Sequence, residues 1–236
     1  MINRIDIKIY NYYGKGSICY INIKIFEECV NIVWGELSYM YEKIAIKLTR
    51  GISKHTNRTD IELTKIKFGI EVLIINISKF LLIITISYFL KIIPLTLILF
   101  ISFGLIRRSA FGLHAKNSIV CTIISTSYFI GGAYISIYYP LEMKIMVLIF
   151  LIQIGLFMKY APSDTESRPL VGKKLRSKLK RDTIVTVLIL LAIALIVNNG
   201  TISMLITLGA TMECISILPI TYKILKRRYN NYEQYK

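Results

Sequence analysis

The sequence predicts an all-α, polytopic integral membrane protein with about six transmembrane helices. Of its 236 residues 54% are hydrophobic, its mean hydropathy is +0.56, and its formal net charge is +16. A soluble domain rarely combines so much apolar surface with so much charge. The apolar residues lie in long runs and the charges lie between them, which is the separation that a bilayer-spanning chain requires.

The runs set the number of expected spans. A helix needs about 20 predominantly apolar residues to cross the hydrocarbon core. Six runs approach that length, at 70–90, 92–106, 119–139, 143–158, 183–197 and 201–220. Prolines, paired arginines, the polar segment 160–182 and an Asn-Asn-Gly sequence separate them, all of which suit turns or loops. The second, fourth and fifth runs are short, so one of them fits a re-entrant segment as well as a span.

The basic residues predict the orientation of these spans. If the N-terminus is cytoplasmic, six spans place residues 1–69, 107–118, 159–182 and 221–236 on the cytoplasmic side. These segments hold 27 of the 30 Lys and Arg residues, as the positive-inside rule requires. We therefore expect both termini in the cytoplasm. Because topology accounts for the charge, we expect no nucleic-acid partner.

The chain ahead of the first span predicts interfacial structure. The first 20 residues mix charged with apolar side chains, so no secretory signal peptide is visible. Residues 22–50 place apolar side chains at helical spacing, which predicts one or two amphipathic helices. They suit packing on the protein and binding of a partner peptide equally well. We expect an interfacial N-terminal region at 1–68, a transmembrane catalytic domain at 69–221 and a basic tail at 222–236.

A histidine and a cysteine stand seven positions apart where a loop becomes a membrane helix, at His114 and Cys121. A cap at Asn117 or Ser118 places Cys121 in or next to the first helical turn. There the unpaired backbone N–H groups and the helix dipole favour a thiolate, and the same N–H groups suit an oxyanion. The four cysteines and two histidines have no metal-ligand spacing, so we expect neither a metal site nor a cofactor.

A direct His–Cys pair requires a bend in the chain. Seven residues of one continuous helix rise about 10 Å, which is too far for proton transfer. Gly112 provides the freedom for such a bend. Arg107 is a candidate for orienting a carbonyl or an acidic substrate, and Asn117 and Ser118 are further candidates for orienting or oxyanion roles. The alternative is that cysteine and histidine are ordinary helix and interfacial residues.

Two motifs resemble the accessory gene regulator B family of membrane peptidases, over roughly residues 66–220. Arg107, Gly112, His114, Ala115 and Cys121 follow its Arg…Gly-x-His-Ala…Cys pattern. Residues 160–170 are similar to its Ala-Pro-x-Asp-Thr loop. Many family members carry two adjacent glycines before the histidine, whereas Phe111 precedes Gly112 here.

The resemblance implies a cysteine endopeptidase of the bacterial plasma membrane, working as a homodimer. It implies cleavage of the acidic C-terminal tail from a quorum-sensing precursor peptide, through a thioester on Cys121, toward a cyclic thiolactone or lactone. The basic loop would attract that tail, although the same charges suit anionic lipid; its residues are Arg168, Lys173, Lys174, Arg176, Lys178, Lys180 and Arg181. The rival interpretation is a non-catalytic peptide exporter or scaffold.

Overall fold

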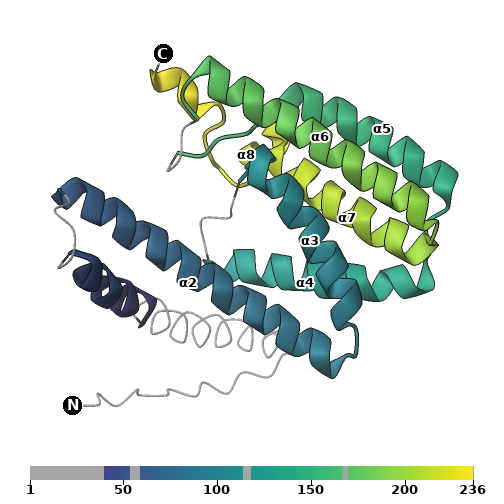
Figure 1. The fold of residues 1–236 in the computed structure, drawn as a ribbon, viewed down its shortest axis with the longest axis horizontal. Helices are drawn as coiled ribbons and strands as arrows, with labels where there is room; N and C mark the ends of the chain where they lie inside the picture. The colour runs from purple at the N-terminus through teal and green to yellow at the C-terminus, as the bar shows by residue number, and fades with distance from the viewer. Residues whose placement is uncertain (1–39, 54–58, 114–117, 167–169, 236) are drawn as a thin grey trace, which may run out of the picture. The chain divides into compact units, whose positions relative to one another are not determined.

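The computed structural model describes residues 40–53, 59–113, 118–166 and 170–235, and within them it confirms the all-α fold (Figure 1). A helix over 40–53 precedes the labelled elements. These are α2 (Asp60–Phe89), α3 (Ile93–Ala110), α4 (Ser118–Tyr138), α5 (Met143–Tyr160), α6 (Lys173–Val197), α7 (Gly200–Ile217), α8 (Pro219–Ile224) and the 3₁₀ helix η1 (Asn231–Tyr235). Helices α2 to α7 correspond in order to the six apolar runs.

The chain divides into two compact units at Ile77 and Ser78, inside α2. In the first unit, Thr59 and Glu62 form a reciprocal cap at the start of α2. The Thr59 N–H donates to Glu62 Oε2 at 3.2 Å and the Glu62 N–H donates to Thr59 Oγ1 at 3.4 Å. An ion pair of 2.7 Å joins Lys67 of α2 to Glu42 of the helix over 40–53. Of the helical pattern predicted over 22–50, residues 40–50 are helical, and residues 22–39 lie outside the described part of the chain.

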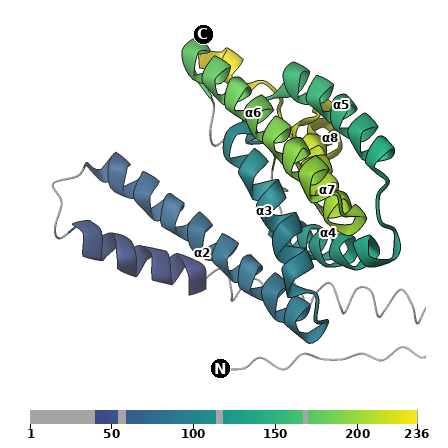
Figure 2. The ribbon, with the colours of Figure 1, turned by 45° about the vertical axis from the view of Figure 1, so that its right-hand side comes forward.

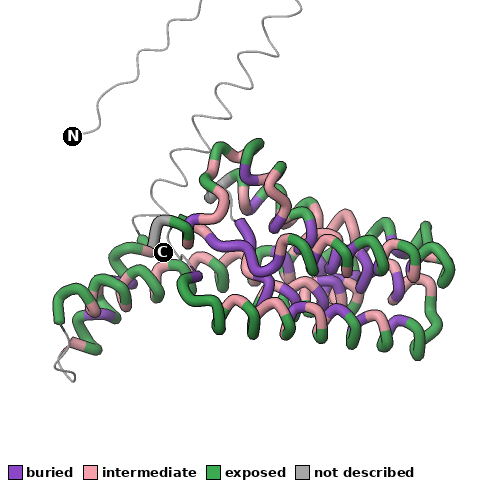
Figure 3. The backbone as a smooth tube through the Cα atoms, turned by 90° about the horizontal axis from the view of Figure 1, so that it is seen from above, coloured by how far each residue is buried: buried purple, intermediate pink, exposed green. Residues whose placement is uncertain are grey.

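The second unit is a bundle built around α7. Helices α3, α4, α5 and α6 all pack against α7, and Figures 1 and 2 show α5, α6 and α7 side by side. Buried residues run through the interior of this bundle (Figure 3). Gly209 allows the close approach of α3 and α7, because a Cβ there would lie 2.9 Å from Phe103 N and 3.0 Å from Leu99 O.

Five of the described helices, α2, α3, α4, α5 and α7, are long and apolar enough to cross a membrane. The chain is therefore a polytopic membrane protein. Helix α6 differs because all seven of its charges lie between Lys173 and Asp182, and the 15 predominantly apolar residues that follow extend only about 22 Å. The whole of α6 has 25 residues and extends about 37 Å. The helix therefore reaches the thickness of the hydrocarbon core only when its charged turns are included.

The loops of the bundle gather at its two ends. At one end, the connection between α4 and α5 meets the one between α6 and α7, where the Leu141 N–H donates to the Gly200 carbonyl at 3.0 Å. At the other end, the segment after α3 meets the segment after α5 and the end of α7. Two loops predicted to share the cytoplasmic side thus lie together.

Candidate active site

The segment that leads to His114 begins with a sharp change of backbone direction. Helix α3 ends at Ala110, and Phe111 and Gly112 follow with φ angles of 62° and 92°. Both angles lie in the left-handed region, which glycine adopts readily and phenylalanine does not. Because α4 begins only at Ser118, no single helix joins α3 to Cys121.

Backbone hydrogen bonds fix this segment to the 161–166 loop that follows α5 and to the end of α7. The Gly112 N–H donates to the Ser163 carbonyl at 3.0 Å, and the Ser163 N–H donates to the Ala110 carbonyl at 2.9 Å. On the other side, the Leu113 N–H donates to the Ser216 carbonyl at 3.1 Å. The residue directly before His114 is therefore anchored to α7.

Arg107 holds the same segment through its side chain. Its Nη2 donates to the carbonyls of Gly112 and Leu113 at 3.0 and 3.2 Å. Its Nη1 donates to Ser216 Oγ at 2.8 Å and to Glu213 Oε2 at 3.1 Å. The Glu213 side chain is fully buried, and an unpaired charge there would cost several kcal/mol. The guanidinium thus neutralises a buried carboxylate while it binds the backbone before His114.

Position 112 favours glycine both by its φ of 92° and by the space around it. A Cβ on Gly112 would meet Ser216 Oγ and would lie 2.6 Å from Arg107 Nη1. Gly112 was predicted to provide freedom for a bend. The structure adds that it also makes room for the Arg107 side chain.

Cys121 is the fourth residue of α4 and is half-buried, so it lies in the first helical turn as predicted. The first four N–H groups of a helix have no partner within it, and they give this end a partial positive charge. His114 and Asn117 lie outside the described residues, as does the side chain of Ser118. The His–Cys pair and the roles of Asn117 and Ser118 therefore stay predictions.

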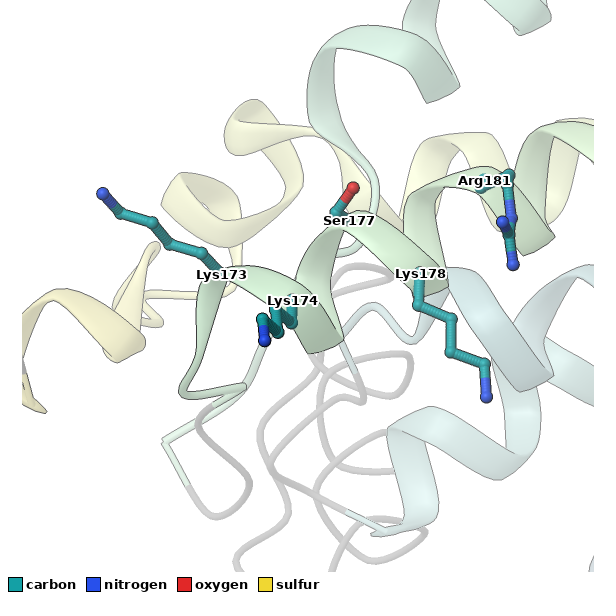
Figure 4. Close-up of a pocket in the computed structure, with 5 residues that line it drawn as sticks. All are labelled: Lys173, Lys174, Ser177, Lys178 and Arg181. Carbon is teal, nitrogen blue, oxygen red and sulfur yellow. The ribbon is translucent and has the colours of Figure 1, made fainter.

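The basic residues predicted to bind an acidic peptide tail fall into separate groups. Four of them line an open cavity of about 540 Å³ along the start of α6, together with Ser177 (Figure 4): Lys173, Lys174, Lys178 and Arg181. Their spacing places them on one face of the helix. Arg176 instead donates to the Pro162 carbonyl at 3.5 Å and stacks on the Tyr232 ring. Lys180 is half-buried outside the cavity lining, and Arg168 lies outside the described residues.

Sequence reasoning missed the contacts that hold the site together. Glu213 had a signal, because a carboxylate inside an apolar run needs a buried partner. Its pairing with Arg107 joins residues 106 positions apart, so spacing along the chain could not reveal it. Ser163 and Asp164 belong to the Ala-Pro-x-Asp-Thr motif, but their roles depend on contacts that only the fold creates.

Comparison with known proteins agrees with the motifs. The model of the family "Accessory gene regulator B" matches residues 45–217. A putative AgrB-like protein of Clostridium acetobutylicum is 45% identical over 84% of this chain and 95% of its own length. Another, of Listeria innocua, is 39% identical over 78% of this chain and 91% of its own length.

A more distant relative carries the family's own name. The accessory gene regulator protein B of Staphylococcus haemolyticus is 29% identical over 72% of this chain and 90% of its own length. No solved structure matches the chain. The chain therefore belongs to the accessory gene regulator B family, and it takes part in the processing of quorum-sensing peptides.

Proposed function

We propose that this protein is a membrane-embedded cysteine endopeptidase of the bacterial plasma membrane. It removes the acidic C-terminal tail of a quorum-sensing precursor peptide and prepares the remainder for ring closure. The observation that carries the proposal is the position of Cys121 in the first turn of α4, eight residues after Leu113, whose backbone carbonyl Arg107 binds.

In the first step, His114 takes the proton of the Cys121 thiol, and the thiolate attacks the carbonyl carbon of the scissile peptide bond. The first-turn N–H groups of α4 stabilise the oxyanion that forms. The C–N bond then breaks, and the imidazolium of His114 returns its proton to the leaving amine. The products are a free tail and a thioester on Cys121.

In the second step, His114 takes the proton of a Cys or Ser side chain of the bound peptide, and the sulfur or oxygen of that side chain attacks the thioester carbonyl. A thiolactone or lactone forms, and the Cys121 sulfur leaves as a thiolate. Hydrolysis of the thioester competes with this ring closure, so a site that limits water favours the ring. The position of Cys121 at the start of an apolar helix suits that requirement.

The basic face of α6 suits the acidic tail of the precursor. Four basic side chains surround one open cavity: Lys173, Lys174, Lys178 and Arg181. They lie at the N-terminal end of α6, where the helix dipole adds positive potential. An acidic peptide would be attracted there at low salt. Anionic lipid headgroups carry the same negative charge as an acidic peptide tail, so an experiment distinguishes the two ligands.

The test of the catalytic step co-expresses the protein with a tagged precursor peptide and measures the shortened fragment. We expect Cys121→Ala and His114→Ala to abolish cleavage. Cys214 is the matched control, because it is a buried cysteine of α7 outside the proposed chemistry. Cys214→Ala should keep cleavage. Cleavage by Cys121→Ala, or transport of an uncut peptide by the wild type, would favour the exporter or scaffold instead.

The test of the basic face replaces Lys173, Lys174 and Lys178 by Gln together. We expect KM for an acid-tailed precursor to rise and its salt dependence to weaken, while a precursor with a neutral tail is cleaved as before. Lys144→Gln, on exposed surface near the start of α5, is the control. An equal loss with both precursors would assign the basic face to lipid or to folding.

A further inference from the structure

The end of the chain docks on the 161–166 loop through a buried carboxylate. The side chain of Asp164 accepts hydrogen bonds from the backbone N–H groups of Asn231 and Tyr232, at 3.0 and 2.7 Å. Asp164 and Asn231 are each only 3% exposed. A charged group buried this deeply depends on its hydrogen bonds, so the loop and the C-terminal segment, residues 227–235, stabilise each other.

Further contacts fix the same segment. Arg176 of α6 lies 3.5 Å from the centroid of the Tyr232 ring, within cation–π range, and it also donates to the Pro162 carbonyl. Glu166 accepts from Arg227 Nη1 at 3.1 Å and from the Arg228 N–H at 3.2 Å. Figure 1 shows the C-terminus beside the start of α6. The C-terminal segment is thus held ahead of η1 through Arg227 and Arg228, and in the first turn of η1 through Asn231 and Tyr232.

Tyr222 of α8 completes the docking. Its hydroxyl donates to the Asp164 carbonyl at 2.7 Å, and its ring meets that of Tyr229 at a centroid distance of 5.1 Å. Burial raises the pKa of Tyr222 to about 12, so the hydroxyl keeps the proton that it donates throughout the neutral range. The loop backbone is therefore bound from α8 as well as from the C-terminal segment.

The loop connects this docking to the segment that leads to His114. Ser163 is the neighbour of Asp164, and it exchanges backbone hydrogen bonds with Gly112 and Ala110. A shift of the loop would therefore move the backbone that precedes His114. A displacement of about 1 Å at a reacting group costs up to roughly 100-fold in rate, so this connection is sensitive enough to affect catalysis.

We propose that the C-terminal segment, residues 227–235, is a positioning element of the active site and acts through Asp164. The proposal rests on the proposed function, because it assigns the positioned group to His114. The match to the family model ends at residue 217, so the segment lies beyond the part of the chain that the family model describes. Asp164 is a positioning residue with no chemical step of its own.

The experiment compares a chain that ends after Lys226, Asp164→Ala, and the two changes combined. We expect kcat for precursor cleavage to fall roughly 10- to 100-fold in each, with KM little changed. Because the shortened chain already lacks the Asp164 contacts with Asn231 and Tyr232, the combination should be no slower than the shortened chain alone. Glu142→Ala is the control, since Glu142 is an exposed residue directly before α5 whose side chain makes no cap hydrogen bond, and it should keep the wild-type rate.

A second measurement follows the proposed His114–Cys121 pair in the absence of substrate. The rate of Cys121 alkylation against pH reports the formation of its thiolate, and we expect the midpoint in the shortened chain to move toward that of His114→Ala. Asp164→Asn keeps one side-chain acceptor, so its kcat and its alkylation midpoint should lie between those of wild type and Asp164→Ala. This variant replaces the shortened chain if the shortened chain does not accumulate in cells.

Wild-type kcat and alkylation midpoint in the shortened chain would overturn the proposal, and so would losses that multiply in the combined variant. If Asp164→Asn is the variant that accumulates, its wild-type behaviour would overturn the proposal as well. Failure of the proposed function gives a different result, namely cleavage by Cys121→Ala.

Discussion

At the scale of single residues, the site depends on positive φ angles, which residues with a side chain adopt less readily than glycine does. Phe111 and Gly112 turn the chain with positive φ angles, and Arg107 fills the space that Gly112 leaves open. The sequence predicted a bend at this point from one glycine. It could not predict the Arg107 clamp, because Glu213 and Ser216 reach the segment only after α7 has packed against α3.

Gly112→Ala tests this conformation. We expect precursor cleavage to fall by about 100-fold or more, because the added Cβ would displace Arg107 and strain the backbone by roughly 1–3 kcal/mol. Gly155→Ala in α5, where a Cβ meets nothing within 4 Å, should keep both cleavage and thermal stability in detergent. Wild-type cleavage by Gly112→Ala would show that the site does not need this geometry.

At the scale of elements, α7 organises the bundle. The apolar runs predicted α2 to α7, because the length and polarity of a run decide whether it can span a bilayer. They could not predict which helix lies at the centre. Gly209 explains one of its contacts, because the missing side chain lets α7 approach the α3 backbone near Phe103.

Gly209→Ala should therefore separate α3 from α7. We expect a loss of roughly 1–3 kcal/mol in unfolding free energy, together with weaker cleavage, since Arg107 and Glu213 lie on these two helices. Unfolding in detergent at increasing temperature measures the loss. Gly131→Ala in α4, which has open space for its Cβ, is the control, and equal melting of the two variants would contradict the packing.

At the scale of the whole molecule, charge predicted which loops share a side of the membrane, and two of those loops do meet at one end of the bundle. The loop after α3 and the loop after α5 pair through Gly112 and Ser163. The docking of the C-terminal segment was beyond sequence reasoning, because Asp164 and Asn231 are 67 positions apart. Composition predicted a basic tail at 222–236 but did not indicate which part of the chain it contacts.

Single cysteines in a cysteine-free chain test the orientation. We expect Glu142→Cys, in the connection between α4 and α5, to react with a membrane-impermeant thiol reagent in intact cells. Val171→Cys, in the exposed part of the loop before α6, should react only after permeabilisation, because its loop carries the excess of basic residues. The reverse pattern would place the termini outside.

The central claim is that Cys121 carries the peptide as a thioester. Mass spectrometry of the protein after brief exposure to precursor measures this directly. We expect an adduct on Cys121 equal in mass to the precursor without its C-terminal tail, which hydroxylamine removes and which Cys121→Ala does not form. A shortened precursor with no adduct on Cys121, produced equally well by Cys121→Ala, would contradict the account.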